Sequence, residues 1–214
     1  MVRVAGTTDP DWFLRSGRAG YDAVAAHVPL HELTSVLDFG CGCGRVTRYW
    51  DGFAGSVAGS DLDREAVEWC NRNLRFGRFE LNALEPPLVF ADASFDLVYA
   101  LSVFTHLTAS LQLSWRDELV RVLRPGGRLL LTTHGRSYLP RLEPEERDRF
   151  QRGELVVRWG DLPGTNLCSA YHPERYLRET FAGSLELTEL VPEGALGNPT
   201  QDLVLLRAPG RATS

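Results

Sequence analysis

The sequence contains no lysine, and its 23 basic side chains are all arginines. Lysine forms the Schiff base with carbonyl substrates and with pyridoxal phosphate, and it contacts the phosphates in the P-loop of nucleotide hydrolases. The absence of lysine therefore excludes these three kinds of chemistry.

Cysteine is also scarce, with four residues among 214: Cys41, Cys43, Cys70 and Cys168. Four cysteines are too few for a disulfide framework, so reduced thiols are the simplest interpretation. Cys41 and Cys43 provide at most half of a zinc site, because no histidine lies at metal-pair spacing from them. We therefore expect no metal site, and we interpret both residues as small apolar side chains suited to their loop.

Long hydrophobic runs are absent too. No run reaches membrane-spanning length, and residues 1–28 lack the basic start and apolar centre of a secretory signal. We expect a cytoplasmic protein without a membrane partner. The net charge of −5 argues against a nucleic-acid partner, because phosphate binding needs clustered cations. The oligomeric state is not indicated.

Strand-like and helical segments alternate along most of the chain. Apolar runs typical of buried strands span residues 34–40, 55–62, 79–84, 94–102 and 127–134, and helical patterns span residues 63–76 and 108–127. Alternation of this kind predicts parallel strands joined by crossovers, hence a doubly wound, Rossmann-like α/β fold with three αβα layers. Two final runs, 184–191 and 201–208, leave no room for a crossover helix and should pair antiparallel.

The remaining segments fit one domain over residues 1–214. Residues 1–30 form an N-terminal helical segment that we expect to be interrupted at Gly17 and Gly20. Residues 136–170 are polar and irregular, and we expect them to be inserted as a cover over the site. A short helix is predicted at 143–153, a strand at 154–159, and a further helix at 172–183.

The stretch VLDFGCGCGR, residues 36–45, has the composition of a ligand-binding loop after a strand. The dinucleotide fingerprint G-x-G-x-x-G uses its third glycine for close helix–strand packing, and Arg45 occupies that position. A nicotinamide or flavin site is therefore disfavoured.

Together with Asp61 at the end of the next strand and the segment SFDLVYALSVFTHL, this loop resembles the class I S-adenosylmethionine-dependent methyltransferases. The resemblance covers roughly Val36 to His134, and the final antiparallel pair extends it to Arg207. It implies S-adenosylmethionine as cofactor and methyl transfer to an oxygen or nitrogen of an acceptor. We expect a small-molecule acceptor, because the chain has no separate recognition domain.

Several residues are expected to contact this cofactor. Glycines admit its amino acid end, Asp38 holds either that end or the loop, and Asp61 accepts from the ribose hydroxyls. Asn82 stands where the family often has an acidic residue that accepts from the adenine amino group, and its amide could donate to a ring nitrogen. The expected cofactor-binding residues are Asp38, Gly40, Cys41, Gly42, Asp61, Leu62, Asn82, Ala83, Leu84 and Leu101.

His106 and His134 follow the fourth and fifth strands, and both are candidate proton acceptors, although a structural role is open for each. Weaker candidates for acceptor contacts are Tyr138, Tyr171 and His172 beside the inserted segment, and Trp12, Phe13, Arg18 and Tyr21 near the N-terminus. Two other functions stay open: a nicotinamide-dependent oxidoreductase or epimerase, and a non-catalytic S-adenosylmethionine-binding module.

Overall fold

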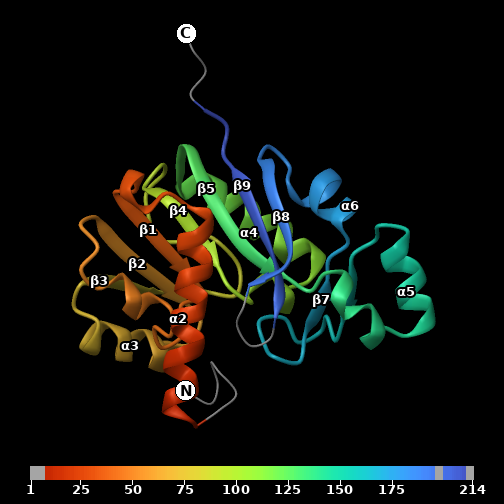
Figure 1. Ribbon diagram of the computed structural model, residues 1–214, viewed down its shortest axis with the longest axis horizontal. Coiled ribbons are helices and arrows are strands. Elements are labelled where there is room, and N and C mark those ends of the chain that lie inside the picture. The colour runs from red at the N-terminus through yellow and green to blue at the C-terminus, as the bar shows by residue number, and fades with distance from the viewer. Residues whose placement is uncertain (1–7, 196–199, 211–214) are drawn as a thin grey trace.

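A computed structural model describes residues 8–195 and 200–210 of the chain. Its main sheet has seven strands in the order β3-β2-β1-β4-β5-β9-β8 (Figure 1). The strands are β1 (Ser35–Phe39), β2 (Ser56–Asp61), β3 (Gly77–Leu81), β4 (Phe95–Ala100), β5 (Leu123–Thr133), β8 (Glu186–Ala195) and β9 (Gln201–Arg207). β1 to β5 pair in parallel, whereas β9 runs antiparallel to both β5 and β8. This confirms the predicted doubly wound sheet and its antiparallel pair.

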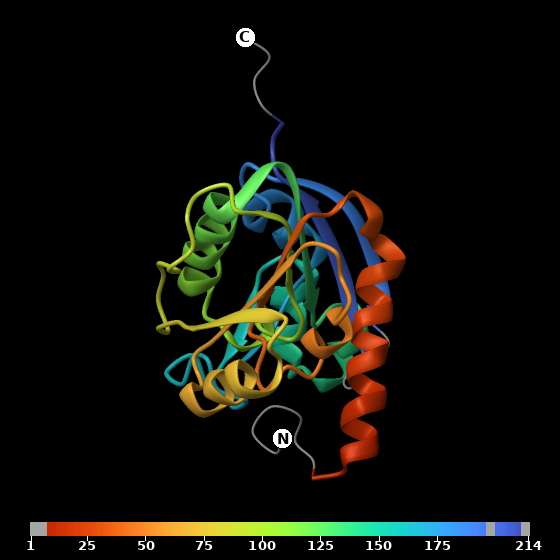
Figure 2. The same ribbon diagram turned by 90° about the vertical axis from the view of Figure 1, so that its left-hand side faces the viewer.

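Helices cover both faces of this sheet, as Figure 2 shows for α2 (Pro10–His27) and α4 (Ala109–Val122). Side chains alternate along each strand, so Val36 packs with the α2 core and Leu37 with the α4 core. α3 (Arg64–Asn73) packs on β2 and β3. The result is the predicted three-layer arrangement, and the carboxyl ends of β1 to β5 are left open between the helices.

The N-terminal helix α2 is continuous from Pro10 to His27, so the interruption expected at its glycines is wrong. A Cβ on Gly17 would lie 2.0 Å from the carbonyl oxygen of Arg45, and one on Gly20 would lie 2.9 Å from Val46 Cγ2. These glycines allow α2 to pack closely on the glycine loop, which offsets their low helix propensity.

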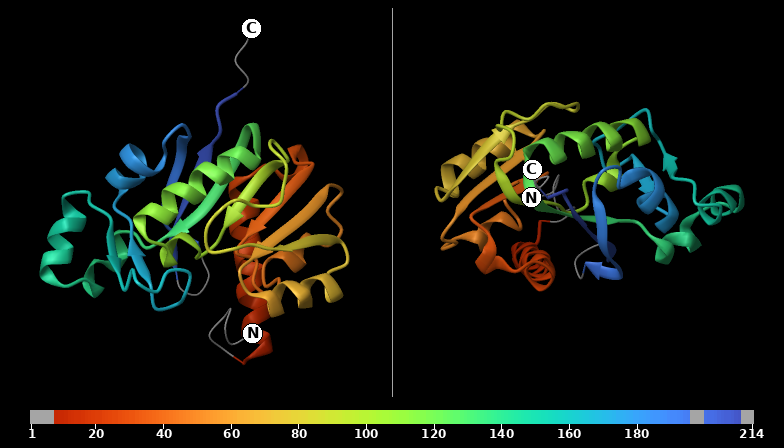
Figure 3. Two further views of the ribbon diagram at one scale, coloured as in Figure 1. Left: turned by 180° about the vertical axis from the view of Figure 1, so that it is seen from behind. Right: turned by 90° about the horizontal axis from the view of Figure 1, so that it is seen from above.

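The segment after β5 forms a lobe at one end of the molecule. It contains η4 (Arg136–Arg141), α5 (Pro144–Gln151), and a two-stranded antiparallel sheet of β6 (Val156–Arg158) and β7 (Ser169–Tyr171). The predicted short helix and strand are therefore confirmed. Figure 3 shows α5 at the opposite end from α3. The helix expected after β7 is short: α6 (Glu174–Tyr176) continues into the π-helical turn η5 (Leu177–Phe181).

Three 3₁₀ turns complete the described elements: η1 (Leu30–Glu32), η2 (Thr47–Trp50) and η3 (Phe104–His106). η2 follows the glycine loop, and η3 follows β4, so both lie near the open edge of the sheet. No helix within the described ranges combines the length and apolarity needed to cross a membrane.

Candidate active site

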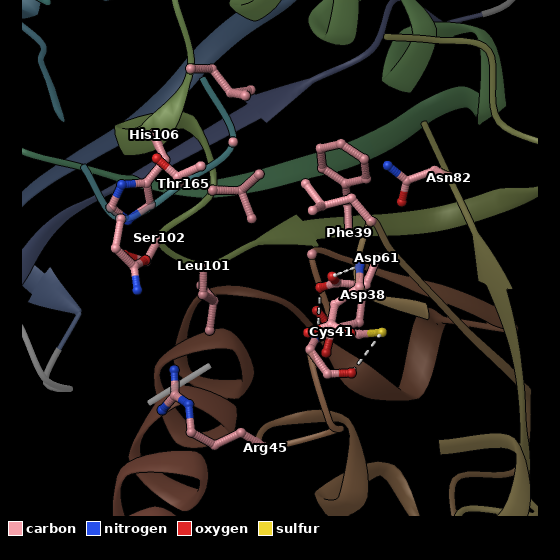
Figure 4. A pocket seen from close by; sticks show the side chains of 18 of the residues that line it. Asp38, Phe39, Cys41, Arg45, Asp61, Asn82, Leu101, Ser102, His106 and Thr165 are labelled. Atoms are coloured by element: carbon pink, nitrogen blue, oxygen red, sulfur yellow. Dashed lines mark hydrogen bonds between the residues drawn. The ribbon is translucent and has the colours of Figure 1, made fainter. Parts of the chain in front are cut away.

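A cavity of about 1020 Å³ opens at the carboxyl ends of β1 to β5 (Figure 4). Every residue expected to bind the cofactor lines this cavity, and so do both histidine candidates. These are Asp38, Gly40, Cys41, Gly42, Asp61, Leu62, Asn82, Ala83, Leu84, Leu101, His106 and His134. The topology explains this, because parallel strands deliver their carboxyl ends to one edge of a sheet.

The glycine loop follows β1 and has left-handed backbone at three glycines, with φ of +82° at Gly40, +53° at Gly42 and +69° at Gly44. A Cβ on Gly40 would lie 2.3 Å from Val103 Cγ2, and one on Gly44 would lie 2.3 Å from Leu74 Cδ1. The glycines are therefore required by packing as well as by backbone conformation.

The loop leads into η2, a four-residue 3₁₀ turn, and not into an α-helix. The dinucleotide fingerprint binds pyrophosphate at an α-helix N-terminus directly after the loop. Residues 40–55, all of which the structure describes, contain no such helix. This geometry disfavours a dinucleotide independently of Arg45.

Asp61, at the end of β2, is hydrogen-bonded to the glycine loop. Its Oδ2 accepts from the backbone N–H of Gly42 at 2.7 Å, and its Oδ1 accepts from the N–H of Asp63 at 2.8 Å. Burial raises the pKa of Asp61, and the two hydrogen bonds oppose that change. Helix α3 is capped by Asp63 instead, which accepts from the N–H groups of Glu65 and Ala66. Asp61 is thus held rigidly at the cavity wall, with further lone pairs on each oxygen.

Asp38 lies at the end of β1 and joins the loop to the sheet. Its Oδ2 accepts from the hydroxyls of Thr47 and of Tyr99, the latter at 2.8 Å, and Tyr99 in turn accepts from Trp50 Nε1 at 3.1 Å. Burial raises the pKa of Asp38 to about 6, although both hydroxyl hydrogen bonds lower it. Of the two roles expected for Asp38, these contacts support holding the loop.

The raised pKa predicts a pH dependence of folding. The folded state holds the proton on Asp38 more tightly than the unfolded state does. The stability that Asp38 contributes through this proton is complete below pH 4 and is lost as the pH rises through about 6. A shift of this size corresponds to about 3 kcal/mol. Between pH 4 and pH 7, urea denaturation should show the stability of the wild type falling relative to that of Asp38→Asn. Burial also raises the pKa of Asp61 and Asp202 and lowers the pKa of His134 and His172, which changes stability in opposite directions, so only the difference between the two proteins reports on Asp38. Parallel stability curves would contradict the assignment.

Asn82 follows β3, and its side-chain oxygen is buried without a hydrogen-bond partner in the described structure. One N–H of its Nδ2 donates to the carbonyl of Ala83 at 2.7 Å, and the second N–H of the amide is left for the expected donation to a ring nitrogen. Trp115 Nε1 donates to the carbonyl of Leu84 at 2.8 Å and holds the same loop. The unsatisfied oxygen of Asn82 is an acceptor ready for an external N–H group.

Both histidine candidates line the cavity wall. Nδ1 of His106 lies 2.8 Å from the carbonyl oxygen of Cys168, and Nδ1 of His134 lies 3.1 Å from that of Ala170. A carbonyl oxygen only accepts, so each Nδ1 carries the proton and each Nε2 has a free lone pair when the ring is neutral. Burial lowers the pKa of His106, and burial together with His106 lowers that of His134 to about 4.

Comparisons with known proteins find methyltransferases. Residues 37–131 match the model of a methyltransferase domain family. The malonyl-[acyl-carrier protein] O-methyltransferase of Enterobacter lignolyticus is 33% identical over 58% of this chain and 49% of its own length. The enzyme of the same name from Pectobacterium atrosepticum is 28% identical over 80% of this chain and 60% of its own length.

A S-adenosylmethionine-dependent methyltransferase from Methanosarcina mazei has the same fold, with a TM-score of 0.65 and 20% identity over 88% of this chain and 97% of that protein. The chain thus resembles the class I S-adenosylmethionine-dependent methyltransferases, in the sequence of residues 37–131 and in its fold. S-adenosylmethionine is the cofactor of that family. The chain spans about half to three fifths of the length of the curated relatives reported above.

Several of the weaker candidates from the sequence lie outside the cavity wall. Tyr138 and Tyr171 pack in the core of the terminal lobe. His172 is buried and bonded to Gln112 at 3.2 Å. Phe13 stacks under Arg48, Arg18 bonds to Asp22 at 2.8 Å, and Tyr21 packs against Trp50. Of these candidates only Trp12 lines the cavity.

The segment 136–170, expected to cover the site, reaches the cavity only with Gly164, Thr165 and Asn166. The N–H of Gly164 donates to the carbonyl of His106 at 2.8 Å, which fastens this loop to η3. A Cβ on Gly164 would lie 2.9 Å from Leu84 Cδ1, so the loop also packs on the turn after β3. The rest of the segment builds the lobe.

Sequence reasoning did not assign Ser102, Thr165 or the side chain of Arg45 to the site, yet all line the cavity. Ser102 has φ of +61°, an uncommon conformation for a residue with a Cβ. It is held by Thr132 Oγ1, which accepts from its N–H at 2.7 Å, and by Gln201, which donates to its hydroxyl at 3.0 Å. Nothing in the local sequence predicts these long-range contacts.

The four cysteines are free thiols. Cys41 and Cys70 both donate to the carbonyl of Gly42, at 3.5 Å and 3.4 Å, and both belong to an apolar cluster with Phe79. For Cys41, the interpretation as a small apolar side chain of the loop is thus supported. Within residues 8–195 and 200–210, no three metal-ligating side chains come together.

Proposed function

We propose that this chain transfers a methyl group from S-adenosylmethionine to an oxygen or nitrogen of a small acceptor bound in the same cavity. The lining of the cavity supports this proposal, because the same cavity contains polar groups suited to a nucleoside and two imidazoles whose Nε2 atoms have free lone pairs. When bound, the cofactor supplies an electrophilic methyl group. The protein aligns the acceptor and excludes water.

The cavity residues fit this cofactor. The unpartnered oxygen of Asn82 is suited to the adenine amino group, and the fixed carboxylate of Asp61 to the ribose hydroxyls. Leu62, Ala83 and Leu84 lie beside these polar groups and would contact the ring and sugar. The residues proposed for the amino acid end and the sulfonium are Asp38, Gly40, Cys41, Gly42 and Leu101.

His106 is the proposed proton acceptor when the acceptor is a hydroxyl or an ammonium group. Its Nδ1–H is held by the carbonyl of Cys168, which directs the role of base to Nε2. Because burial lowers its pKa, the ring stays neutral at neutral pH. His134 is the weaker base, since its pKa lies at about 4.

Replacing His106 with glutamine should lower kcat for a hydroxyl acceptor by about 100-fold, the lower range of the effect of a general base. The wild-type rate should fall only at a pH below the ordinary histidine pKa, because burial lowers the pKa of His106. S-adenosylhomocysteine affinity, measured by calorimetry, should stay within about twofold, since only proton transfer is affected. His31→Gln on the exposed turn η1 is the matched control. An unchanged kcat would exclude His106 as the base.

A carrier-bound carboxylate is a second candidate acceptor, favoured by four relatives named malonyl-[acyl-carrier protein] O-methyltransferases. A carboxylate is already ionised at neutral pH and has no proton to lose. With a malonyl thioester as acceptor, His106→Gln should therefore leave kcat nearly unchanged. The same variant thus distinguishes the two acceptor classes.

The general test uses S-adenosylmethionine labelled in its methyl group, with panels of phenols, hydroxy acids, amines and a malonyl thioester. Transfer of label to any of them supports the proposal. Tight cofactor binding without transfer to any acceptor would favour a non-catalytic binding module. Thermal stabilisation by NAD(H) alone would favour the oxidoreductase, because bound ligand raises the melting temperature.

A further inference from the structure

Gln112 is a fully buried amide on α4 that is bonded to the turn η3. Its Nε2 donates to the carbonyl oxygen of Phe104 at 3.1 Å and to that of Leu107 at 3.0 Å. Phe104 begins η3, and Leu107 directly follows it. Because carbonyl oxygens only accept, these two contacts fix the orientation of the amide and use both of its N–H groups. Gln112 therefore fastens the turn that contains His106 to α4.

The oxygen of the same amide is bonded to the chain that follows β7. The hydroxyl of Tyr176 donates to it at 3.3 Å, and Nε2 of His172 lies 3.2 Å from it. An amide oxygen only accepts, so Nε2 of His172 carries the proton. Burial lowers the pKa of His172 to about 3, which keeps this ring neutral at neutral pH. With two donors and two accepted hydrogen bonds, the amide of Gln112 is fully satisfied.

The imidazole of His106 is bonded between the same two parts of the chain. Its Nδ1–H is held at 2.8 Å by the carbonyl of Cys168, the residue directly before β7, whereas His172 directly follows β7. β7 is only three residues long, and it packs on η3. A shift of η3 relative to β7 would therefore break the hydrogen bond that decides which nitrogen of His106 carries the proton.

We propose that Gln112 is a positioning residue for His106. It joins η3, which carries His106, to the end of β7, and so keeps Nδ1 of His106 against the carbonyl of Cys168 and leaves the lone pair on Nε2. A buried network in which every donor and acceptor is paired favours one arrangement of the segments that it joins. An apolar side chain could fill the same space, but it would not fix the two carbonyls of η3. This inference rests on the role of proton acceptor proposed above for His106.

The first test determines the tautomer of His106 in the protein without ligands. The chain has five histidines, so nuclear magnetic resonance spectra of protein with ¹⁵N-labelled histidine are simple, and His106→Gln assigns the signals of His106. The wild type should carry the proton on Nδ1. Gln112→Met keeps a side chain of similar length without its hydrogen bonds, and it should give a mixture of tautomers.

Gln112→Glu is a more conservative variant that also serves should Gln112→Met not fold. Burial keeps its carboxyl protonated, so it retains one donor toward η3 and an acceptor oxygen toward His172. The share of His106 that carries its proton on Nδ1 should lie between those of the wild type and Gln112→Met. Leu119→Ala is the matched control, because Leu119 is fully buried two turns farther along α4. It lowers stability through a cavity and should leave the tautomer unchanged.

The second test measures methyl transfer to a hydroxyl acceptor found in the labelling assay. Gln112→Met should lower kcat by about 10-fold, part of the loss expected when the base itself is removed. The affinity for S-adenosylhomocysteine should stay within about twofold, since the cofactor contacts are untouched.

An unchanged tautomer in both variants of Gln112 would overturn the proposal. The same change of tautomer in Leu119→Ala would show a general loosening of the fold and would also overturn it. An unchanged kcat in His106→Gln would instead contradict the proposed base, and the tautomer measurement would still decide the role of Gln112. The two failures are therefore distinguishable.

Discussion

Replacing Asp61 with alanine is expected to weaken binding of S-adenosylhomocysteine by about 100-fold or more. The carboxylate is proposed to accept from both ribose hydroxyls, and each hydrogen bond to a charged group contributes about 1.5–3 kcal/mol. The variant also leaves the N–H of Gly42 without its acceptor, which loosens the glycine loop. Isothermal titration calorimetry at constant pH measures the effect directly.

Asp61→Asn separates these two contributions. An asparagine oxygen can still accept from Gly42, but the side chain has lost its charge and one acceptor. We expect an affinity between those of the wild type and Asp61→Ala. Affinity in Asp61→Ala equal to that of the wild type would show that the ribose assignment is wrong.

Replacing Gly40 with alanine is expected to lower the free energy of unfolding by about 2–5 kcal/mol, the sum of a left-handed backbone penalty and an overpacked contact. The backbone at Gly40 has φ of +82°, and the new Cβ would lie 2.3 Å from Val103 Cγ2. Urea denaturation measures the loss. The same change should weaken cofactor binding, because the loop must shift away from Val103.

Two further variants separate the backbone part of this loss of stability from the steric part. Gly52 has φ of +85°, but a Cβ there would meet no atom within 4 Å. Gly52→Ala should therefore lose only the backbone part, about 1–2 kcal/mol. Adding Val103→Ala to Gly40→Ala should recover stability relative to the sum of the single changes, because the two side chains no longer compete for space. Purely additive losses would contradict the proposed clash.

The strands were predictable from local patterns. Each apolar run of the predicted sheet corresponds to an observed strand, and the final pair is antiparallel as the short connection requires. The N-terminal helix was predicted only in part. Gly17 and Gly20 have low helix propensity, and the contacts that favour them in one helix, with Arg45 and Val46, join separate parts of the chain.

Part of the cavity wall was also predictable from the sequence, and part was not. Asp61, Asn82 and His106 each follow a strand, so chain direction alone brings them to the same edge of the sheet. Thr165 was not predictable, because the loop that contains it reaches the cavity through the bond from Gly164 to His106. The roles of Tyr138 and Tyr171 were also undecided by the sequence, since an aromatic residue suits a core and a pocket equally well.

The order of apolar runs and the residues at their carboxyl ends determine the sheet, the glycine loop and most of the cavity wall, because periodicity and chain direction are local properties. The tertiary structure decides which atoms of those residues are free. The carbonyl of Cys168, 62 residues along the chain, accepts a hydrogen bond from Nδ1 of His106 and so fixes which ring nitrogen carries the proton. The hydroxyls of Thr47 and Tyr99 donate hydrogen bonds to Asp38. Arg45 keeps no ionic partner among the described residues. These properties depend on distances between segments that are remote in the chain.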